Sequence, residues 1–359
     1  MLFVDDYAGG AGNVIQIMAN AFYMKEKYLP IVVTLNPHSP KYKLDRHIET
    51  IEHPLSQYKS MNKVFQFVEM VRSIRRLIEK EKPTVIISFL DNINTLVLLS
   101  QYINRSIPII ACERSNPIAI RPNKLWNILR RVAYCRADVI TVQCSNFKSF
   151  MPSMQHKVRV VPNPVLLPKY EKIDYMRQGA VKFVSCARLH PIKQHHKMIE
   201  AIECLYKRGI DCQLTIWGDG PERNNLENII AEKGLQNVVK LPGAVQNVHQ
   251  LLSEGDVYLM TSYQEGFPNA LCEAMAVGLP TISFRCHDGL KDIVQDGVNG
   301  FLTEMDDVPA MVHRMEQLAK QQELCKEMGE AAKCAMQKYD IDTIYKKWDS
   351  IIVSLGVIV

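Results

Sequence analysis

Two glutamates in the segment EGFPNALCEAMAVGLP, residues 265–280, have the clearest potential for chemistry in this sequence. Glu265 follows an apolar run that predicts a strand, and Glu273 lies just over one turn into the helix that should come next. Glutamates also collect near helix N-termini because the helix dipole stabilises them there, by about 0.3–1 kcal/mol each. Their positions alone therefore leave a purely structural role open.

The start of that helix predicts an anion site. Pro268 suits the first turn of a helix, where a missing N–H group is not needed. The free backbone N–H groups around Asn269 should then point from the positive helix end toward a bound anion such as a diphosphate. The residues that such a site would use are Gly266, Phe267, Pro268, Asn269, Ala270 and Leu271.

A second segment, CARLHPIKQHHKMIEAI, places Arg188 and Lys193 on one loop before a predicted helix. Two cations placed in this way are suited to neutralising a diphosphate. Taken alone, the same two residues are more typical of a solvated surface pair than of an anion site. We expect the neighbouring histidines to be polar surface groups rather than ligands; these are His190, His195 and His196.

Strands alternate with helices in both halves of the chain, which predicts an α/β fold of parallel, doubly wound sheets. A Pro-Asn-Pro segment at 162–164 interrupts the series and suits a linker. We therefore predict a domain at 1–163, a second at 164–338, and a C-terminal helix at 339–359 that packs on the first domain. Two such sheets should place a ligand in the cleft between their carboxyl edges. The predicted strands span 31–35, 84–90, 107–112 and 138–144 in the first half and 181–187, 212–218, 238–243, 256–262, 281–284 and 300–303 in the second.

The segment at 265–280, including its trailing AMAVGLP, resembles the signature loop of family 4 glycosyltransferases. That family has the GT-B fold, in which two Rossmann-like domains face each other across a cleft, and it retains the anomeric configuration. Its first glutamate contacts the donor sugar and its second binds the ribose hydroxyls, so the resemblance implies these roles for Glu265 and Glu273. CARLHPIK resembles the family's G-R-L-x-x-x-K-G/N stretch and implies that Arg188 and Lys193 stabilise the departing diphosphate. The family's usual glycine before this arginine is Ala187 here.

Two further segments of the second half resemble the same family. IWGDGPERNNLENII is similar to its strand-to-helix G-D-G-P turn, in which Gly218 would permit a close backbone approach. LPGAV is similar to the segment that flanks the nucleotide base. It implies that the base pocket is lined by Pro242, Gly243 and Ala244.

On the acceptor side, GGAGN at 9–13 resembles the family's glycine-rich loop and brings in Gly10 and Gly12. SFLDN and ACERSNP look like segments of bacterial transferases that add N-acetylhexosamines to polyprenyl-diphosphate-linked oligosaccharides. Many family members have a histidine at the end of the latter strand, where this chain has Glu113 and Arg114. Glu113 could act as a catalytic residue that orients the acceptor hydroxyl, or it could simply pair with Arg114.

Charge is unevenly distributed, since residues 1–163 carry 22 Lys and Arg against 12 Asp and Glu, whereas residues 164–359 carry 21 against 26. A basic first half could face anionic lipid, a phosphate-bearing substrate or nucleic acid. The strip RPNKLWNILRRVAYCR interleaves cations with apolar residues, as membrane-surface helices do, although a solvated cationic face over a core stripe fits equally well. Its cations are Arg121, Lys124, Arg130, Arg131 and Arg136.

Several partners and compartments are not indicated by the sequence. The ten cysteines form no C-x-x-C pair and no D-x-D motif occurs in a suitable loop, so we expect reduced thiols, no cofactor and no metal. The first residues, MLFVDD, lack the basic and apolar regions of a secretory signal, and no apolar stretch reaches spanning length. We expect a cytoplasmic protein, with peripheral binding to the inner face of the cell membrane left open, and no nucleic-acid partner.

These observations predict a retaining glycosyltransferase. It would move a hexose or N-acetylhexosamine from a nucleotide-diphosphate sugar, with UDP as the expected carrier, to a lipid-linked or polysaccharide acceptor. One alternative is a sugar-nucleotide epimerase of the same fold, which would need acidic and histidine groups able to move protons. Another is a non-catalytic protein that binds a nucleotide sugar.

Overall fold

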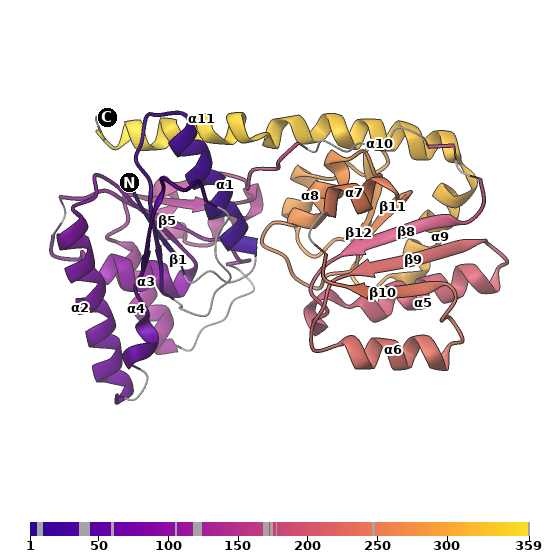
Figure 1. Ribbon diagram of the computed structural model, residues 1–359, viewed down its shortest axis with the longest axis horizontal. Coiled ribbons are helices and arrows are strands. Elements are labelled where there is room, and N and C mark those ends of the chain that lie inside the picture. Colours follow the sequence, from indigo (N-terminus) through magenta and orange to yellow (C-terminus); the bar gives the residue numbers. More distant parts are fainter. Residues whose placement is uncertain are drawn as a thin grey trace. The chain divides into compact units, whose positions relative to one another are not determined.

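The computed structural model describes residues 1–5, 10–35, 44–58, 61–104, 106–117, 124–167, 172, 175–176, 178–245 and 248–357. It divides into two compact units. Unit 1 comprises Met1–Pro164 together with Ile341–Val359, and unit 2 comprises Val165–Asp340. Each unit is an α/β domain built on its own parallel sheet (Figure 1).

Unit 1 holds a parallel sheet of seven strands among its described residues. The order across the sheet is β3 (Glu49–Glu52), β2 (Ile31–Thr34), β1 (Leu2–Asp5), β4 (Ile86–Phe89), β5 (Ile109–Cys112), β6 (Val139–Val142) and β7 (Val158–Val160). β3 was not predicted, because its sequence ETIE is polar and mostly exposed at the edge of the sheet. The central strands are apolar and fully buried, as expected for a sheet covered on both faces.

Helices cover both faces of the unit 1 sheet. Right-handed crossovers place α1 (Gly10–Met24) on one face and α2 (Lys63–Glu81), α3 (Asp91–Ser100) and α4 (Lys124–Tyr134) on the other. The C-terminal α11 (Ile341–Ser354) lies along α1, and its buried Trp348 belongs to the same hydrophobic core as Phe3 and Phe22 (Figure 1). Asp349 fixes α11 further, because it accepts hydrogen bonds from Lys27 Nζ at 2.7 Å and Tyr28 Oη at 2.6 Å. Short 3-10 segments are η1 (Leu55–Tyr58), η2 (Ser145–Ser149) and η3 (Pro152–Lys157).

Unit 2 holds a parallel sheet of six strands among its described residues. The order is β10 (Val239–Gly243), β9 (Cys212–Trp217), β8 (Val181–Cys186), β11 (Val257–Met260), β12 (Thr281–Phe284) and β13 (Gly300–Thr303). The chain first progresses from β8 to β10 in one direction and then returns to continue from β11 to β13 in the other. The order therefore reverses between β8 and β11, which is the topological switch point where open α/β sheets bind ligands.

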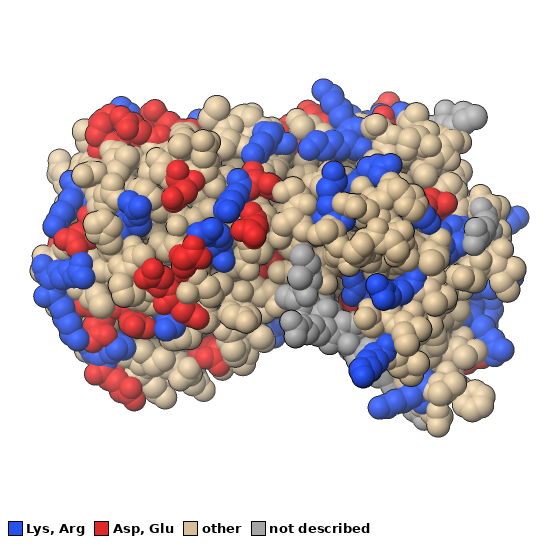
Figure 2. All heavy atoms as spheres, turned by 180° about the vertical axis from the view of Figure 1, so that it is seen from behind, with Lys and Arg blue, Asp and Glu red and all other residues tan. Residues whose placement is uncertain are grey.

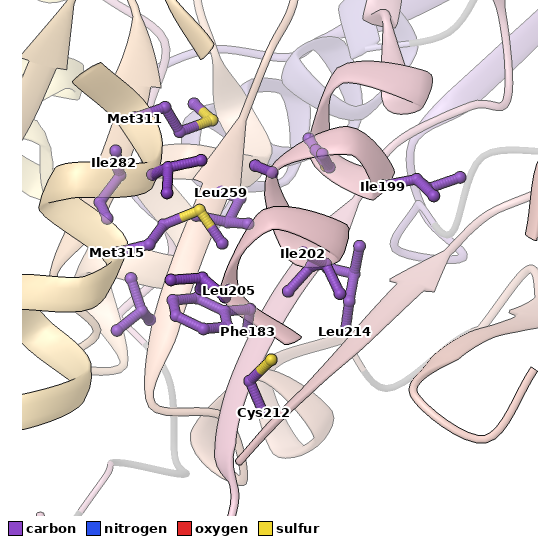
Figure 3. Packing of buried hydrophobic residues seen from close by; sticks show 14 of the residues in the cluster. Phe183, Ile199, Ile202, Leu205, Cys212, Leu214, Leu259, Ile282, Met311 and Met315 are labelled. Carbon is purple, nitrogen blue, oxygen red and sulfur yellow. The ribbon is translucent and has the colours of Figure 1, made fainter. Parts of the chain in front are cut away.

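The core of unit 2 fills the space between its sheet and two helices. Figure 3 shows Phe183 and Leu214 of the sheet packed beneath α5 (His195–Lys207) and α9 (Val308–Lys320), with Ile202 and Met315 between them. The remaining helical segments are α6 (Arg223–Glu232), α7 (Val248–Ser253), α8 (Asn269–Ala276), α10 (Gln322–Met336), η4 (Pro191–Lys193), η5 (Asp288–Asp292) and η6 (Gln337–Tyr339). Within the described part of the chain, no helix combines the length and apolar character that crossing a bilayer requires.

Candidate functional site

The loops that leave β8 and β11 carry the predicted cations and glutamates. These two strands are hydrogen-bonded neighbours, with Val257 beside Phe183 and Tyr258 beside Val184. Because they are parallel, their loops leave the same carboxyl edge of the sheet. Arg188 and Lys193 therefore come from one side of the switch point, and Glu265 and Glu273 come from the other.

Lys193 and Glu265 form an ion pair, with Nζ 2.6 Å from Oε1. Both side chains are largely buried, so this pair is better shielded from water than an ordinary surface pair. The sequence predicted both residues but not their direct contact. The pair joins the β8 loop to the β11 loop at the point where a diphosphate was expected.

Backbone contacts hold the same two loops together. The N–H of Tyr263 donates to the carbonyl of Ile192 at 2.8 Å. The Thr261 hydroxyl lies 2.9 Å from the carbonyl oxygen of Lys193 and 3.0 Å from that of Gln194, and it is fully buried. Thr261 and Tyr263 thus position Lys193, and the sequence did not indicate them because neither belongs to a recognisable motif.

The N-terminus of α8 lies directly after Glu265 and differs in one detail from the prediction. Pro268 stands at the N-cap, and the helix begins at Asn269. The Asn269 N–H donates to the Phe267 carbonyl at 3.0 Å, so it does not point freely outward as expected. The N–H groups of Ala270 and Leu271 have no hydrogen-bond partner among the described residues. Of the three expected donors, two therefore remain for an anion.

Phe267 and Gly266 shape the loop before α8. The Phe267 ring is buried and packs edge-on against Tyr339, with ring centroids 5.7 Å apart. Tyr339 in turn donates from its hydroxyl to the carbonyl of Asp292 at 2.7 Å. Phe267 therefore anchors the loop from behind, and the part of the loop formed by Gly266 is only partly covered.

Glu273 faces the end of β8 from the first turns of α8. It is partly buried, and desolvation raises the pKa of its carboxyl from 4.5 to about 7. Its charge helps to raise the pKa of the Cys186 thiol to about 11, after the larger effect of burial, so the two side chains are neighbours. Glu273 makes no hydrogen bond or ion pair with any described residue. An unpaired carboxylate at this place is suited to accept hydrogen bonds from the hydroxyls of a ligand.

Binding of a nucleotide-diphosphate sugar should strengthen as the pH rises from about 6 to about 8, because Glu273 becomes a carboxylate as it passes its pKa of about 7 and then accepts hydrogen bonds more strongly. Titration calorimetry at several pH values measures this. A Glu273→Gln variant should bind more weakly and lose the pH dependence.

The stability of the ligand-free protein should change with pH in the opposite direction to ligand affinity. Between pH 4.5 and about 7 the folded state holds the Glu273 proton that the unfolded state releases, so this residue's contribution to stability falls as the pH rises. The Tm difference between Glu273→Gln and the parent should therefore grow across this range. Equal pH dependence in the two proteins, for both binding and Tm, would contradict this role for Glu273.

Gly218 and Gly220 bring the β9 loop against the β8 loop. A Cβ at Gly218, whose φ is +143°, would overlap the carbonyl oxygen of Ala187, and one at Gly220 would overlap that of Leu189. The Leu189 N–H donates to the Asp219 carbonyl at 3.0 Å across the same contact. The close approach predicted for Gly218 is thus made to the backbone that carries Arg188.

Arg188 extends from this contact as an exposed side chain with no hydrogen bond or ion pair to a described residue. The Gly218 N–H also donates to the Gly243 carbonyl at 2.8 Å, which ties the end of β10 to the same edge. Pro242 and Ala244 are exposed on either side of Gly243. Their role in holding a base stays a prediction.

The three histidines differ from one another. His196 is exposed, as expected, and His190 is half-buried and accepts from the Ile192 N–H at 3.3 Å. His195 is 2% exposed, so its assignment to the surface was wrong. It is the first residue of α5, and desolvation, with Lys193 nearby, lowers its pKa to about 4. It is therefore a neutral, buried residue beneath the β8 loop.

Glu113 and Arg114 do not pair with each other. Glu113 is 1% exposed and accepts a hydrogen bond from the Tyr134 hydroxyl, while Arg130 Nη2 lies 3.6 Å from its Oε1. Arg114 donates to the Val161 carbonyl at 3.1 Å and to Asn163 Oδ1 at 2.9 Å. The proposed pairing of the two residues was wrong, because consecutive side chains at the end of β5 point to different surroundings.

The catalytic role of Glu113 stays a prediction. Burial raises the pKa of its carboxyl, and Arg130 partly offsets this effect. Asn94 donates from Nδ2 to the Tyr134 hydroxyl at 3.0 Å, which leaves the Tyr134 hydroxyl hydrogen for Glu113. This geometry makes Glu113 the centre of an internal network at the carboxyl edge of β5.

The prediction of a basic strip on the surface needs a correction, because two of its cations are buried. Arg130 and Arg136 have side chains that are only 4% and 2% exposed. Arg136 donates from Nε to the Gln101 carbonyl at 2.8 Å, so it fastens loops rather than facing solvent. Lys124 and Arg131 are exposed, and Arg121 lies outside the described residues.

The glycine-rich segment at 9–13 is shorter as a loop than predicted. α1 begins at Gly10, so Gly10 and Gly12 lie in its first turn, and Gly12 is buried. Residues 6–9, which include the first part of that segment, lie outside the described residues. A contact of these glycines with an acceptor stays a prediction.

Known proteins are similar to this chain, some over its second unit and others over nearly its full length. Residues 172–334 match the family model for Glycosyl transferases group 1. The GalNAc-α-(1→4)-GalNAc-α-(1→3)-diNAcBac-PP-undecaprenol α-1,4-N-acetyl-D-galactosaminyltransferase of Campylobacter jejuni is 27% identical over 352 residues, which are 97% of this chain and 96% of the relative. The poly(ribitol-phosphate) α-N-acetylglucosaminyltransferase of Staphylococcus aureus is 28% identical over 163 residues, 45% of this chain and 33% of the relative.

Two solved structures share the fold over nearly the full length. HepE from Anabaena in complex with UDP and glucose superposes with a TM-score of 0.81 at 19% identity, covering 98% of this chain and 99% of its own. Sucrose-phosphate synthase from Thermosynechococcus elongatus gives 0.84 at 15% identity, covering 99% and 98%.

The fold and the two sheets define the class of protein: this chain has the GT-B fold of two α/β domains. Within that class, residues 172–334 match the family model for Glycosyl transferases group 1, and the residues at the β8–β11 switch point lie inside the matched segment.

Proposed function

We propose that this chain is a retaining glycosyltransferase of family 4. It moves a hexose or N-acetylhexosamine from a UDP-sugar to a lipid-linked or polysaccharide acceptor, without a metal cofactor. The observation that carries the proposal is the Lys193–Glu265 pair beside the N-terminus of α8, at the switch point of the group 1 domain. The acceptor is inferred from the polyprenyl-diphosphate named in the Campylobacter jejuni relative, and the carrier from the UDP bound in HepE.

The reaction breaks the bond between the anomeric carbon of the sugar and the diphosphate, and it forms a bond to an acceptor hydroxyl oxygen, whose proton leaves with the departing diphosphate. Charge then develops on the departing diphosphate. We expect Lys193, Arg188 and the positive end of α8 to stabilise this charge, because electrostatic stabilisation is usually the largest effect that a preorganised site supplies. Glu265 would hold the sugar and Glu273 the ribose, so that the donor is fixed at both ends.

The epimerase alternative fits the site less well. Such an enzyme needs groups that give and take protons beside the sugar. Glu265 is engaged by Lys193, and His195 is buried beneath the loop. Transfer asks only for positioning and charge stabilisation, which these residues offer.

Incubating the full chain with bacterial membranes and a panel of radiolabelled nucleotide sugars tests the proposal. We expect label from one UDP-sugar to enter the lipid or polysaccharide fraction, and we expect EDTA to leave the rate unchanged. Loss of activity with EDTA, restored by a divalent cation, would contradict the metal-free part alone. No transfer of label from any donor would contradict the proposed function.

A further inference from the structure

Large apolar side chains are exposed on two helices of unit 1. On α2, and at Met61 just before it, these side chains recur three and four residues apart, which places them on one side of the helix. The same holds on α4. Phe65 is 67% exposed and Leu125 is 78% exposed, so no other described residue covers them. We call these side chains the α2–α4 face: Met61, Val64, Phe65, Val68, Leu125, Ile128 and Val132.

The two stripes belong to one surface. α2 and α4 both pack against α3 on the same face of the sheet (Figure 1). The rings of Phe67 and Trp126 meet edge-on with centroids 6.2 Å apart, which joins the first turns of α2 to those of α4. Helices that follow parallel strands begin at the carboxyl edge of the sheet. The α2–α4 face therefore lies near the edge where Rossmann-like sheets bind their ligands.

The charges around this face are mostly positive, and the nearest acidic side chain on α2, Glu69, is paired with Arg72 and Arg76. Residues 61–68 and 124–132 contain no Asp or Glu, and their exposed cations are Lys63, Lys124 and Arg131. Figure 2 shows that Lys and Arg predominate over Asp and Glu on the visible face of unit 1. A second copy of the chain, paired symmetrically through this face, would bring these cations against one another. An anionic surface with an apolar interior would match both the cations and the exposed apolar side chains.

We propose that the α2–α4 face binds an anionic lipid bilayer, with its apolar side chains inserted at the boundary between headgroups and acyl chains and its cations on the headgroups. The sequence pattern placed this binding on the strip with Arg121, Lys124, Arg130, Arg131 and Arg136, of which the structure shows Arg130 and Arg136 to be internal. The apolar side chains of α2 take their place. The biological role of this binding rests on the proposed function, because a lipid-linked acceptor would reach the carboxyl edge of unit 1 from the bilayer that holds it. The binding itself can be measured independently of that function.

Vesicle flotation of the full chain tests this proposal, with no sugar or acceptor present. The lipids are phosphatidylcholine alone or phosphatidylcholine mixed with phosphatidylglycerol. A Phe65→Ser/Leu125→Ser variant should lower the partition coefficient on anionic vesicles by roughly tenfold or more, because the inserted apolar area is lost. A Lys63→Gln/Lys124→Gln/Arg131→Gln variant should lose the preference for phosphatidylglycerol and the sensitivity to salt.

A matched control uses Leu29→Ser/Ile103→Ser. These side chains are 79% and 86% exposed, and they lie in loops at the opposite, amino edge of the same sheet. The control should bind vesicles like the parent, and unchanged thermal unfolding should show that all variants are folded. Partition of the Phe65→Ser/Leu125→Ser variant equal to the parent's would overturn the proposal. The proposal would also be overturned if the parent protein bound neither kind of vesicle but formed a dimer that this variant abolished. Failure here leaves sugar transfer measurable, so the two proposals can fail separately.

Discussion

A Lys193→Ala variant should transfer sugar with a kcat/KM about 10²–10³-fold below that of the parent, mostly through kcat. Glu265 holds the Lys193 side chain at 2.6 Å, and the Thr261 hydroxyl lies 2.9 Å from the Lys193 carbonyl oxygen, so this cation is fixed in position. Its charge should matter most when the diphosphate departs, which is an interaction made in the transition state. The rate of label incorporation at limiting donor measures the effect.

Lys197→Ala is the matched control for this prediction. Lys197 lies four residues further along, on α5, and pairs with Glu200 at 3.6 Å on the same helix. Its removal should change kcat/KM by less than about twofold, because such helix-surface pairs contribute little. A Lys193→Ala enzyme within tenfold of the parent would show that the diphosphate leaves from another place.

Glu265→Ala should be damaged about as severely as Lys193→Ala, and the double variant should be little worse than either single one. Residues that act as a unit are strongly non-additive, and the two side chains contact each other directly. Full additivity of the two losses would mean that each residue acts alone.

Gly218→Ala should unfold unit 2 at markedly lower denaturant, with a loss of at least about 3 kcal/mol in the free energy of unfolding. The new Cβ would overlap the Ala187 carbonyl, which is backbone and cannot rotate away. Relief of that overlap must separate the β9 loop from the β8 loop. Any folded fraction should therefore have a displaced Arg188 and reduced donor affinity.

Gly209→Ala separates this overlap from simple backbone strain. Gly209 also has a positive φ, +75°, but nothing lies within 4 Å of an added Cβ. Its substitution should cost only about 1 kcal/mol. Urea unfolding of the two variants measures the difference, and equal losses would contradict the role assigned to the contact between Gly218 and Ala187.

The sequence predicted most strands, because buried parallel strands are short apolar runs bounded by polar turns. β3 was not predicted because its sequence, ETIE, is polar, and only pairing with β2 makes it a strand. The C-terminal helix predicted at 339–359 is shorter in the structure, where α11 begins at Ile341, because no glycine or proline marks the break at Asp340.

The candidate site divides in the same way. The resemblance of their motifs to those of a known family indicated Lys193, Glu265 and Glu273, and the predicted strand order indicated that their loops could meet. It did not identify Thr261 or the burial of His195, since both depend on tertiary packing of side chains that local sequence does not specify.

Glu113 shows most clearly that local sequence does not predict the partners of a buried side chain. Pairing with its sequence neighbour Arg114 was one of the two alternatives for this residue, whereas its actual partners Tyr134 and Arg130 come from a helix about 20 residues later. Only the folded sheet brings α4 over the end of β5.

A crystal structure of the full chain with a bound UDP-sugar tests the central claim most directly. The account predicts that the diphosphate lies within hydrogen-bond distance of Lys193 Nζ and of the Ala270 and Leu271 N–H groups, with the ribose hydroxyls on the Glu273 carboxylate. A donor bound with its diphosphate away from the N-terminus of α8, or held by unit 1, would contradict it.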